Sequence, residues 1–234
     1  MKTWSPAVKA VVCTLGIVSV VVGALGAWAD AALDTAQLVE KSKIAVESLA
    51  ADHNLAAFHD LAKRAKGVFI APEILKAAFV VGASGGSGVL VVRDEKTGKW
   101  HGPAFYTLGA ASFGLQIGGE ASEVAVLAMT ERGVTAMLQP SVKLGADASV
   151  AAGPVGLGAS GATANISADL VSFSHSKGLY GGISLEGAVL AVRNEWNNTY
   201  YGKTVTPTDI LVHGEATRPG AAGLIAAVGK LAGR

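Results

Sequence analysis

The feature that most constrains the fold is a long series of valine-rich, glycine-spaced segments in the middle of the chain. Apolar runs recur from Val68 to Val192, and glycines or polar turns separate them. Both ends of the chain instead repeat apolar residues every three or four positions, over 30–66, 208–212 and 221–231. Strands flanked by helices predict an α+β fold, with an antiparallel sheet or partial barrel between N-terminal and C-terminal helices.

Several boundaries follow from turn and capping signals. Residues 89–92 precede a polar turn at 94–98 and then Trp100, which predicts a hairpin. The N-terminal helical stretch is expected to break at 52–54, and Gly67 is expected to end its second half. Further strands are expected over 105–119, 123–130, 144–152, 170–174 and 179–192.

An internal similarity links two of these strands. Residues 89–95 and 189–195 are identical at five of seven positions, and Trp100 and Gly102 then align with Tyr200 and Gly202. Two related strand units within one domain are the interpretation we prefer. A chance similarity between two valine-rich strands is the alternative.

The first 29 residues have the pattern of a signal peptide. Lys2 and Lys9 precede an uncharged apolar run, and Ala27-Trp28-Ala29 places small residues where signal peptidase cleaves. We predict a signal peptide over 1–29, one domain over 30–234, and a periplasmic or secreted protein with peripheral membrane association as an option. An uncleaved anchor is the alternative, because the apolar run approaches the length that spans a bilayer.

Charge and cysteine content narrow the function classes. Cleavage after residue 29 would change the formal net charge from +1 to −1 and remove Cys13, the one cysteine in the sequence. A near-neutral domain argues against nucleic acid as a partner, because that partner requires a large basic field. Without thiols the exported domain would hold no disulfide, so packing alone would stabilise it.

Two glycine-rich strings resemble catalytic motifs without their context. Ser84 lies in G-A-S-G-G, yet a serine elbow needs a helix directly after the serine, and glycines and a strand follow here. These glycines are expected to permit tight turns or a close approach of backbones. Residues 156–161 match G-x-G-x-x-G but lie late in the chain among predicted strands and polar loops. We therefore predict no enzyme and no catalytic residue.

Histidines give no metal pattern. His53 and His59 are six residues apart, which places them on different faces of a helix, and the other histidines are isolated in sequence. We predict neither a metal nor a cofactor.

Cations next to aromatic residues remain as candidates for binding. Amphipathic surfaces place such residues at a membrane interface, with rings at headgroup depth and charges on phosphates. The alternative is that the aromatics fill the core and the cations are solvated or paired with Glu95 and Glu195. The candidate lipid-binding residues are Lys63, Arg64, Lys66, Arg93, Lys99, Trp100, Lys177 and Arg193.

Several motifs in order resemble the SYLF domain family over essentially the whole chain after residue 30. The most specific are 65–70 (AKGVFI), 85–90 (GGSGVL), 100–104 (WHGPA), 114–118 (GLQIG), 153–156 (GPVG) and, most strongly, 174–187 (SHSKGLYGGISLEG). In this resemblance Gly85 to Gly88 corresponds to a glycine turn of the family.

The resemblance implies binding without catalysis. Eukaryotic members bind phosphoinositide headgroups through basic residues and an amphipathic N-terminal helix, and some bind actin. Carried over by position, the helix would be residues 35–65 and the basic residues Lys63, Arg64 and Lys66. Because an export signal would separate this domain from actin and phosphoinositides, we expect common phospholipids as ligands and no actin binding.

A structural role is the alternative function. Small residues such as Gly109, Ala111, Gly114 and Gly118 would allow another layer to approach these strands closely. An envelope assembly protein that binds itself or a protein partner would use such strands. The sequence leaves the oligomeric state open.

Overall fold

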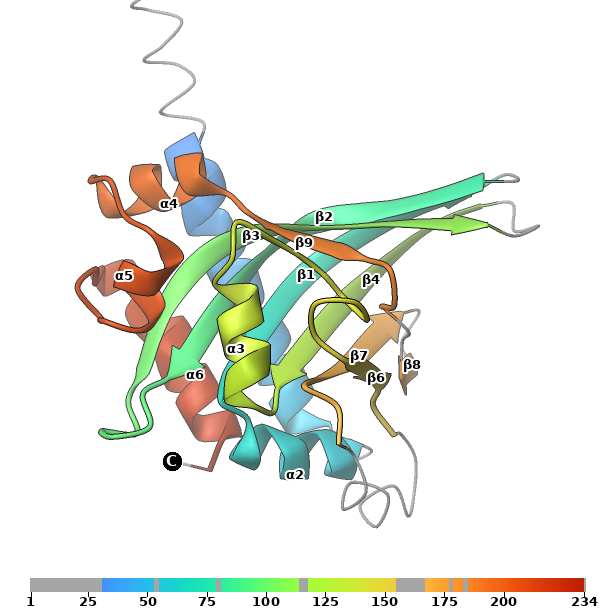
Figure 1. Ribbon diagram of the computed structural model, residues 1–234, viewed down its shortest axis with the longest axis horizontal. Coiled ribbons are helices and arrows are strands. Elements are labelled where there is room, and N and C mark those ends of the chain that lie inside the picture. The colour runs from blue at the N-terminus through green and yellow to red at the C-terminus, as the bar shows by residue number, and fades with distance from the viewer. Residues whose placement is uncertain are drawn as a thin grey trace, which may run out of the picture.

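One strongly curved sheet organises the molecule (Figure 1). The computed structural model describes residues 31–52, 55–78, 81–113, 118–154, 167–176, 179–182 and 185–233. Its strands are β1 (Gly67–Ala78), β2 (Val81–Arg93), β3 (Trp100–Phe113), β4 (Gly118–Ala128), β5 (Ser141–Lys143), β6 (Val150–Ala152), β7 (Leu170–Ser176), β8 (Leu179–Gly182) and β9 (Val189–Val192). Their order is β5-β9-β3-β2-β1-β4-β7-β6, with β8 paired to β7, and only the β6–β7 pair is parallel among these.

The four long strands β1 to β4 form the centre and are buried on both faces where helices cover them. Val89 and Val91 of β2 pack into the core on one face, while Leu90 and Val92 pack into the core on the other. Burial on both sides explains why this strand is a continuous apolar run instead of an alternating one. The expected α+β architecture with an antiparallel sheet curled into a half-barrel is confirmed.

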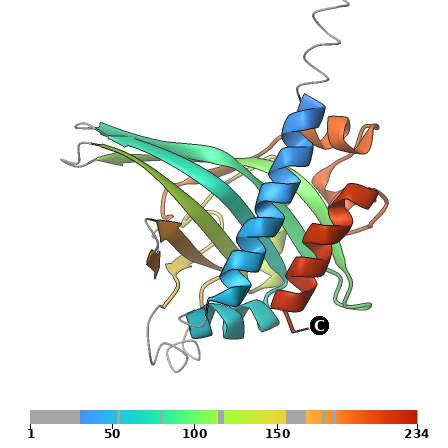
Figure 2. The ribbon, with the colours of Figure 1, turned by 180° about the vertical axis from the view of Figure 1, so that it is seen from behind.

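Helices from the two ends of the chain cover one face of the sheet. The N-terminal helix, residues 31–51, lies beside α6 (Ala222–Leu231), as Figure 2 shows. The short helix α2 (Ala56–Arg64) follows, and its buried Phe58 meets Phe173 of β7 edge to face with ring centroids 5.0 Å apart. The expected break between two N-terminal helices is present, although residues 53 and 54 themselves lie outside the described residues.

Two short helices lie over the other face: α3 (Glu131–Met137) and α5 (Pro207–Leu211). Thr130 caps α3 by accepting a hydrogen bond from Gly133 N, and its hydroxyl donates to Asp169 Oδ1 at 2.7 Å. Ser149 donates its backbone N–H and its hydroxyl to Asp169 Oδ2 at 3.1 and 2.8 Å. These hydrogen bonds, above all the one from Thr130, lower the pKa of the buried Asp169 carboxyl. One carboxylate thus ties α3 to the loops before β6 and β7.

The helix α4 (Asn194–Tyr201) protects the open edge of β3, where β9 does not reach. Asn197 Oδ1 accepts a hydrogen bond from Phe105 N at 2.9 Å, and Tyr201 donates its hydroxyl to Pro103 O at 2.9 Å. Side chains therefore satisfy backbone groups that a neighbouring strand would otherwise satisfy. Neither α3 nor α4 was expected from the sequence patterns.

The glycines at 85–88 form no turn, contrary to the expectation drawn from the resemblance. They lie inside β2, opposite a bulge of β1 between Ile70 and Leu75. A Cβ atom on Gly86 would lie 2.2 Å from Glu73 O, and one on Gly88 would lie 2.5 Å from Phe69 Cζ. Close approach, the second explanation given for these glycines, is therefore the correct one.

Other boundaries differ from the sequence expectation. Gly67 begins β1, because α2 already ends at Arg64 with Ala65 in an extended conformation. Residues 144–149 form a turn region between β5 and β6 instead of a strand. The two similar segments both supply strands antiparallel to β3, yet β2 continues into a turn and β9 into α4. The similarity thus ends where the strands end.

Candidate functional site

Cations gather at the end of the sheet where α2 ends, β1 begins and the β2–β3 turn lies. We call this region the basic end. Its exposed members come from α2, the turn and the last turn of α6: Lys63, Arg64, Lys96, Lys99 and Lys230. Lys66 and Arg93 lie partly buried beside them, and Arg93 N donates to Lys66 O at 2.8 Å. Cations that are distant in sequence therefore lie together, because the end of α2, the β2–β3 turn and the last turn of α6 meet at this end of the sheet.

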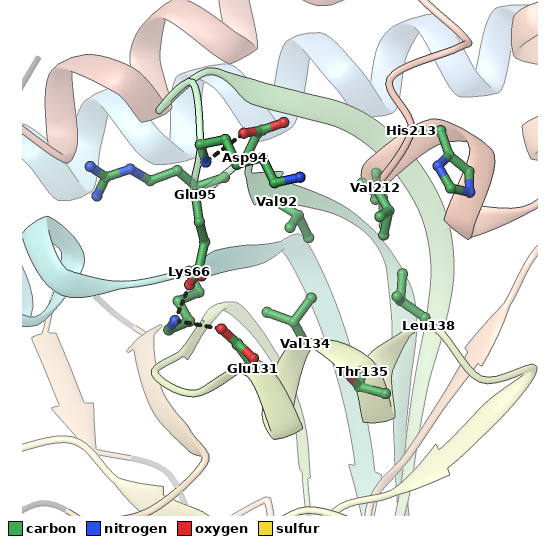
Figure 3. A pocket seen from close by; sticks show the side chains of 13 residues that line it. Lys66, Val92, Asp94, Glu95, Glu131, Val134, Thr135, Leu138, Val212 and His213 are labelled. Carbon is green, nitrogen blue, oxygen red and sulfur yellow. Dashed lines mark hydrogen bonds and ion pairs between the residues drawn. The ribbon is translucent and has the colours of Figure 1, made fainter.

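A cleft of about 440 Å³ opens beside the basic end, between the β2–β3 turn, α3 and the end of α5 (Figure 3). Its apolar wall consists of Val92, Val134, Leu138, Leu211 and Val212. Its polar rim carries Lys66, Arg93 and Lys96, together with Asp94, Glu95, Glu131 and His213. An apolar wall under a charged rim suits an amphiphile, with the chain against the wall and the head at the rim.

Lys66 is the cation of the rim that forms ion pairs with two carboxylates. Its ammonium donates to Glu95 Oε1, and Glu131 Oε1 lies 3.5 Å from Nζ, as the dashed lines in Figure 3 mark. The hydrogen bond to Glu95 raises the pKa of Lys66, and the same bond lowers the pKa of the Glu95 carboxyl. The carboxylates of Glu95 and Glu131 therefore neutralise the most central cation of the rim.

The predicted residues of α2 and the turn are accessible. Lys63 forms an exposed ion pair with Asp60 at 3.4 Å, a type of pair that contributes little stability. Arg64 and Lys99 are also exposed. Together with Lys66 and Arg93, these three predicted residues share the basic end.

Trp100 and Arg193 do not join this surface. Trp100 is 8% exposed and packs into the core under α6, so the alternative reading of a core aromatic describes it. Arg193 lies at the start of α4, where its guanidinium is 3.4 Å from the Trp196 ring centroid and donates to Ser87 Oγ at 2.9 Å. Ser87 is six residues from Arg93 along β2, a backbone separation of about 20 Å, so the guanidinium bound to Ser87 lies away from the basic end. Lys177 lies outside the described residues.

Sequence reasoning missed the α3 and α5 side of the cleft. The Thr130-Glu131 cap signal could have revealed α3, but the preceding apolar run obscured it. No local signal places Val212 or His213 opposite Lys66, because α5 reaches the cleft only through its packing on β2 and β3.

In the described parts of the chain, the glycine-rich string around Ser84 and the histidines lack the surroundings that a catalytic serine or a metal site needs. Ser84 lies within β2, paired with Lys76 and Ala110, and no helix follows it. No group of three or more His, Cys, Asp or Glu side chains could hold a metal among the described residues. The string at 156–161 falls outside them. Within the same residues, no helix has the length and hydropathy to cross a bilayer.

Comparison with known proteins identifies the family. A family model described as Las17-binding protein actin regulator (Ysc84) matches residues 109–231. The SH3 domain-containing YSC84-like protein 1 of Homo sapiens is 37% identical over 163 residues, which cover 69% of this chain and 46% of that protein. LAS seventeen-binding protein 3 of Saccharomyces cerevisiae (strain ATCC 204508 / S288c) is 36% identical over 156 residues, which cover 65% of this chain and 34% of that protein.

The chain therefore spans half or less of the length of these relatives. The family description concerns binding and regulation instead of catalysis. The match to residues 109–231 covers more than half of the sequence and agrees with the motifs noted in it. The chain thus belongs to the Ysc84 family, the SYLF domain family.

Proposed function

We propose that this domain is an exported, non-catalytic protein that binds phospholipid headgroups at a membrane surface through its basic end. The observation that supports this proposal is a cluster of cations at one end of the sheet, beside a cleft with an apolar wall. The cluster consists of Lys63, Arg64, Lys66, Arg93 and Lys99. Each exposed cation near an anionic surface contributes about 1 kcal/mol to binding. The cleft offers apolar contact to the first part of an acyl chain below the headgroup.

The names of the relatives point to Las17 and actin regulation. For this chain, we propose lipid in place of those partners, because the predicted signal peptide would carry the domain across a membrane, away from actin. An actin co-sedimentation assay should therefore be run beside the vesicle assay, so that binding to actin and binding to lipid are compared directly. Actin pelleting with saturable affinity, without vesicle binding, would contradict the proposal.

Vesicle sedimentation tests the proposal. The purified protein is mixed with zwitterionic vesicles and with vesicles that also contain anionic phospholipid, at low and moderate salt. We expect binding that increases with anionic content and decreases with salt, since exposed charges are screened. Absence of binding to every composition would refute the lipid function.

Charge reversal locates the surface. The double variant Lys63→Glu with Arg64→Glu should weaken vesicle binding by at least about tenfold, since two contacts of about 1 kcal/mol each become repulsive. Lys41→Glu with Lys143→Glu is the matched control, because both side chains are exposed, Lys41 beside Glu73 and Lys143 on β5, and neither belongs to the basic end. Equal losses in the two variants would show a net-charge effect and not a site.

Self-association is a second candidate, favoured by one observation. Leu75 of β1 is 58% exposed, and a Cβ atom on Gly109 of β3 would meet nothing within 4 Å. A second layer could therefore approach this part of the sheet. Light scattering coupled to size-exclusion chromatography distinguishes the two candidates, because a stable oligomer that is indifferent to lipid would favour assembly.

A further inference from the structure

We propose that the cleft beside the basic end selects phospholipids whose headgroup carries a primary ammonium, as a phosphoethanolamine headgroup does. The inference rests on the proposed lipid function and names the headgroup that the cleft takes. The cleft holds about 440 Å³, within the roughly 300–1,000 Å³ range of small-molecule sites, and its apolar wall lies below a charged rim. Such a space suits a headgroup together with the first part of its chains.

Two carboxylates on the rim share one ammonium. Glu95, from the β2–β3 turn, and Glu131, from the first turn of α3, both point toward Lys66 Nζ (Figure 3). The hydrogen bond from Lys66 lowers the pKa of the Glu95 carboxyl, which is therefore ionised at neutral pH. Lys66 balances one of the two negative charges, and two carboxylates accept more hydrogen bonds than one ammonium can donate. A negative charge and free acceptors therefore remain for a second ammonium.

Two cations of the same rim are available for a phosphate. Arg93, which is partly buried, and Lys96, which is exposed, have no carboxylate within ion-pair distance among the described residues. Arg93 lowers the pKa of Glu95 less than Lys66 does. Asp94, the third carboxylate of the rim, accepts hydrogen bonds from two backbone N–H groups of the β2–β3 turn at 2.8 Å, so it serves the turn itself. The rim thus presents a negative part and a positive part.

Charge complementarity selects the headgroup. A headgroup with negative charge alone would be repelled by Glu95 and Glu131. A phosphoethanolamine headgroup places its ammonium on this carboxylate pair and its phosphate on Arg93 and Lys96, and the contacts are charge-assisted hydrogen bonds. A serine headgroup has the same ammonium but adds a carboxylate, which the pair would repel.

Choline headgroups do not match the cleft. Their quaternary ammonium has no N–H group to donate, and proteins recognise such groups with cages of aromatic rings. No Phe, Tyr or Trp lines the cleft in the part of the chain that the structure describes. The cleft therefore distinguishes two lipids of equal net charge by hydrogen bonding.

Vesicles that differ only in the amine test this selection. All contain the same fraction of anionic phospholipid, and the remainder is choline lipid, ethanolamine lipid, or ethanolamine lipid with one or two N-methyl groups. The protein should bind ethanolamine vesicles about fivefold more tightly than choline vesicles, with affinity decreasing at each methylation, because hydrogen-bond donors are lost at constant net charge. Equal affinities across the series would overturn the inference and leave the proposed lipid function standing. Absence of binding to every vesicle would overturn both.

A pair of variants separates headgroup recognition from membrane packing, which ethanolamine lipids also change. Glu95→Gln with Glu131→Gln should bind choline vesicles at least as tightly as the unmodified protein does, and should lose the preference for ethanolamine. Glu186→Gln with Glu195→Gln alters two exposed positions outside the cleft and should keep the preference. A preference that survives in the cleft variant, or that disappears in the control as well, would refute the assignment to the rim.

Soluble ligands test contact with the apolar wall. In methyl spectra recorded by NMR, a short-chain ethanolamine phospholipid should shift the signals of Val134, Leu138 and Val212 in a saturable titration. Free phosphoethanolamine has no chain, so it should bind more weakly and leave these signals nearly unmoved. Unmoved signals with the short-chain lipid, or equal affinities for the two ligands, would contradict a membrane lipid as the ligand of the cleft.

Discussion

Removing the carboxylates that neutralise Lys66 should strengthen binding to anionic membranes. The rim of the cleft carries Lys66, Arg93 and Lys96 against Asp94, Glu95 and Glu131, so its formal charge is balanced. Glu95→Gln with Glu131→Gln adds two net positive charges there. At about 1 kcal/mol for each charge near an anionic surface, the gain is about 2 kcal/mol, or roughly 30-fold in affinity at low salt.

Screening by solvent and salt reduces this expected gain in affinity. The side chains of Glu95 and Glu131 are 52% and 74% exposed, so a gain nearer fivefold is expected at physiological ionic strength. Vesicle titration with partly anionic lipid measures it at both salt concentrations. Glu186→Gln with Glu195→Gln is the control, because it changes the net charge by the same amount at two exposed positions outside the cleft.

A gain confined to the cleft variant would support the rim as the headgroup site. Unchanged or weaker binding of the cleft variant at low salt would refute the reasoning, since Lys66 would then play no part in lipid contact. Equal gains in both variants would refute it too, because binding would then depend on net charge alone.

Three further predictions concern stability. Asp169→Asn should cost about 1.5–3 kcal/mol at neutral pH, the value of hydrogen bonds to a charged group. Because hydrogen bonds depress the native pKa of Asp169, its contribution is complete above the unfolded pKa of about 3.9 and is lost as the pH falls through the lower native pKa. Urea unfolding should therefore show the stabilities of the two proteins converging in acid, below the unfolded pKa. Gly88→Ala should destabilise by about 1–3 kcal/mol in the same assay, because its methyl group would collide with Phe69. Gly109→Ala, with no atom within 4 Å of its new methyl group, should be neutral or stabilise by up to about 1 kcal/mol, and a loss comparable to that of Gly88→Ala would contradict the steric argument.

Much of the fold could be predicted from residue patterns. The three- to four-residue apolar repeat predicted the N-terminal helix and α6, and the valine-rich run with its polar turn predicted the β2–β3 hairpin. The short helices were harder. No helix was predicted for residues 194–201, yet they form α4, where Asn197 and Tyr201 bind the edge of β3. Those hydrogen bonds join residues about one hundred positions apart, so no local signal reports them.

The candidate site, like the fold, was only partly predictable from the sequence. The predicted residues Lys63, Arg64 and Lys66 lie together at the basic end, because residues adjacent in sequence stay adjacent in any fold. It placed Trp100 with the surface cations, but alternation along β3 turns this side chain into the core under α6. The pairing of Lys66 with Glu131 and the apolar wall from α3 and α5 required the folded sheet.

The amino-acid sequence by itself determined the family, the helical ends, the strand-rich centre and the presence of close-packing glycines, since these depend on local periodicity and residue size. Only the tertiary structure decided which cations face solvent, which are neutralised and which polar groups are left without partners. Burial and pairing arise from contacts between distant segments, and those contacts exist only once β1 to β4 have formed one sheet and the helices have covered it.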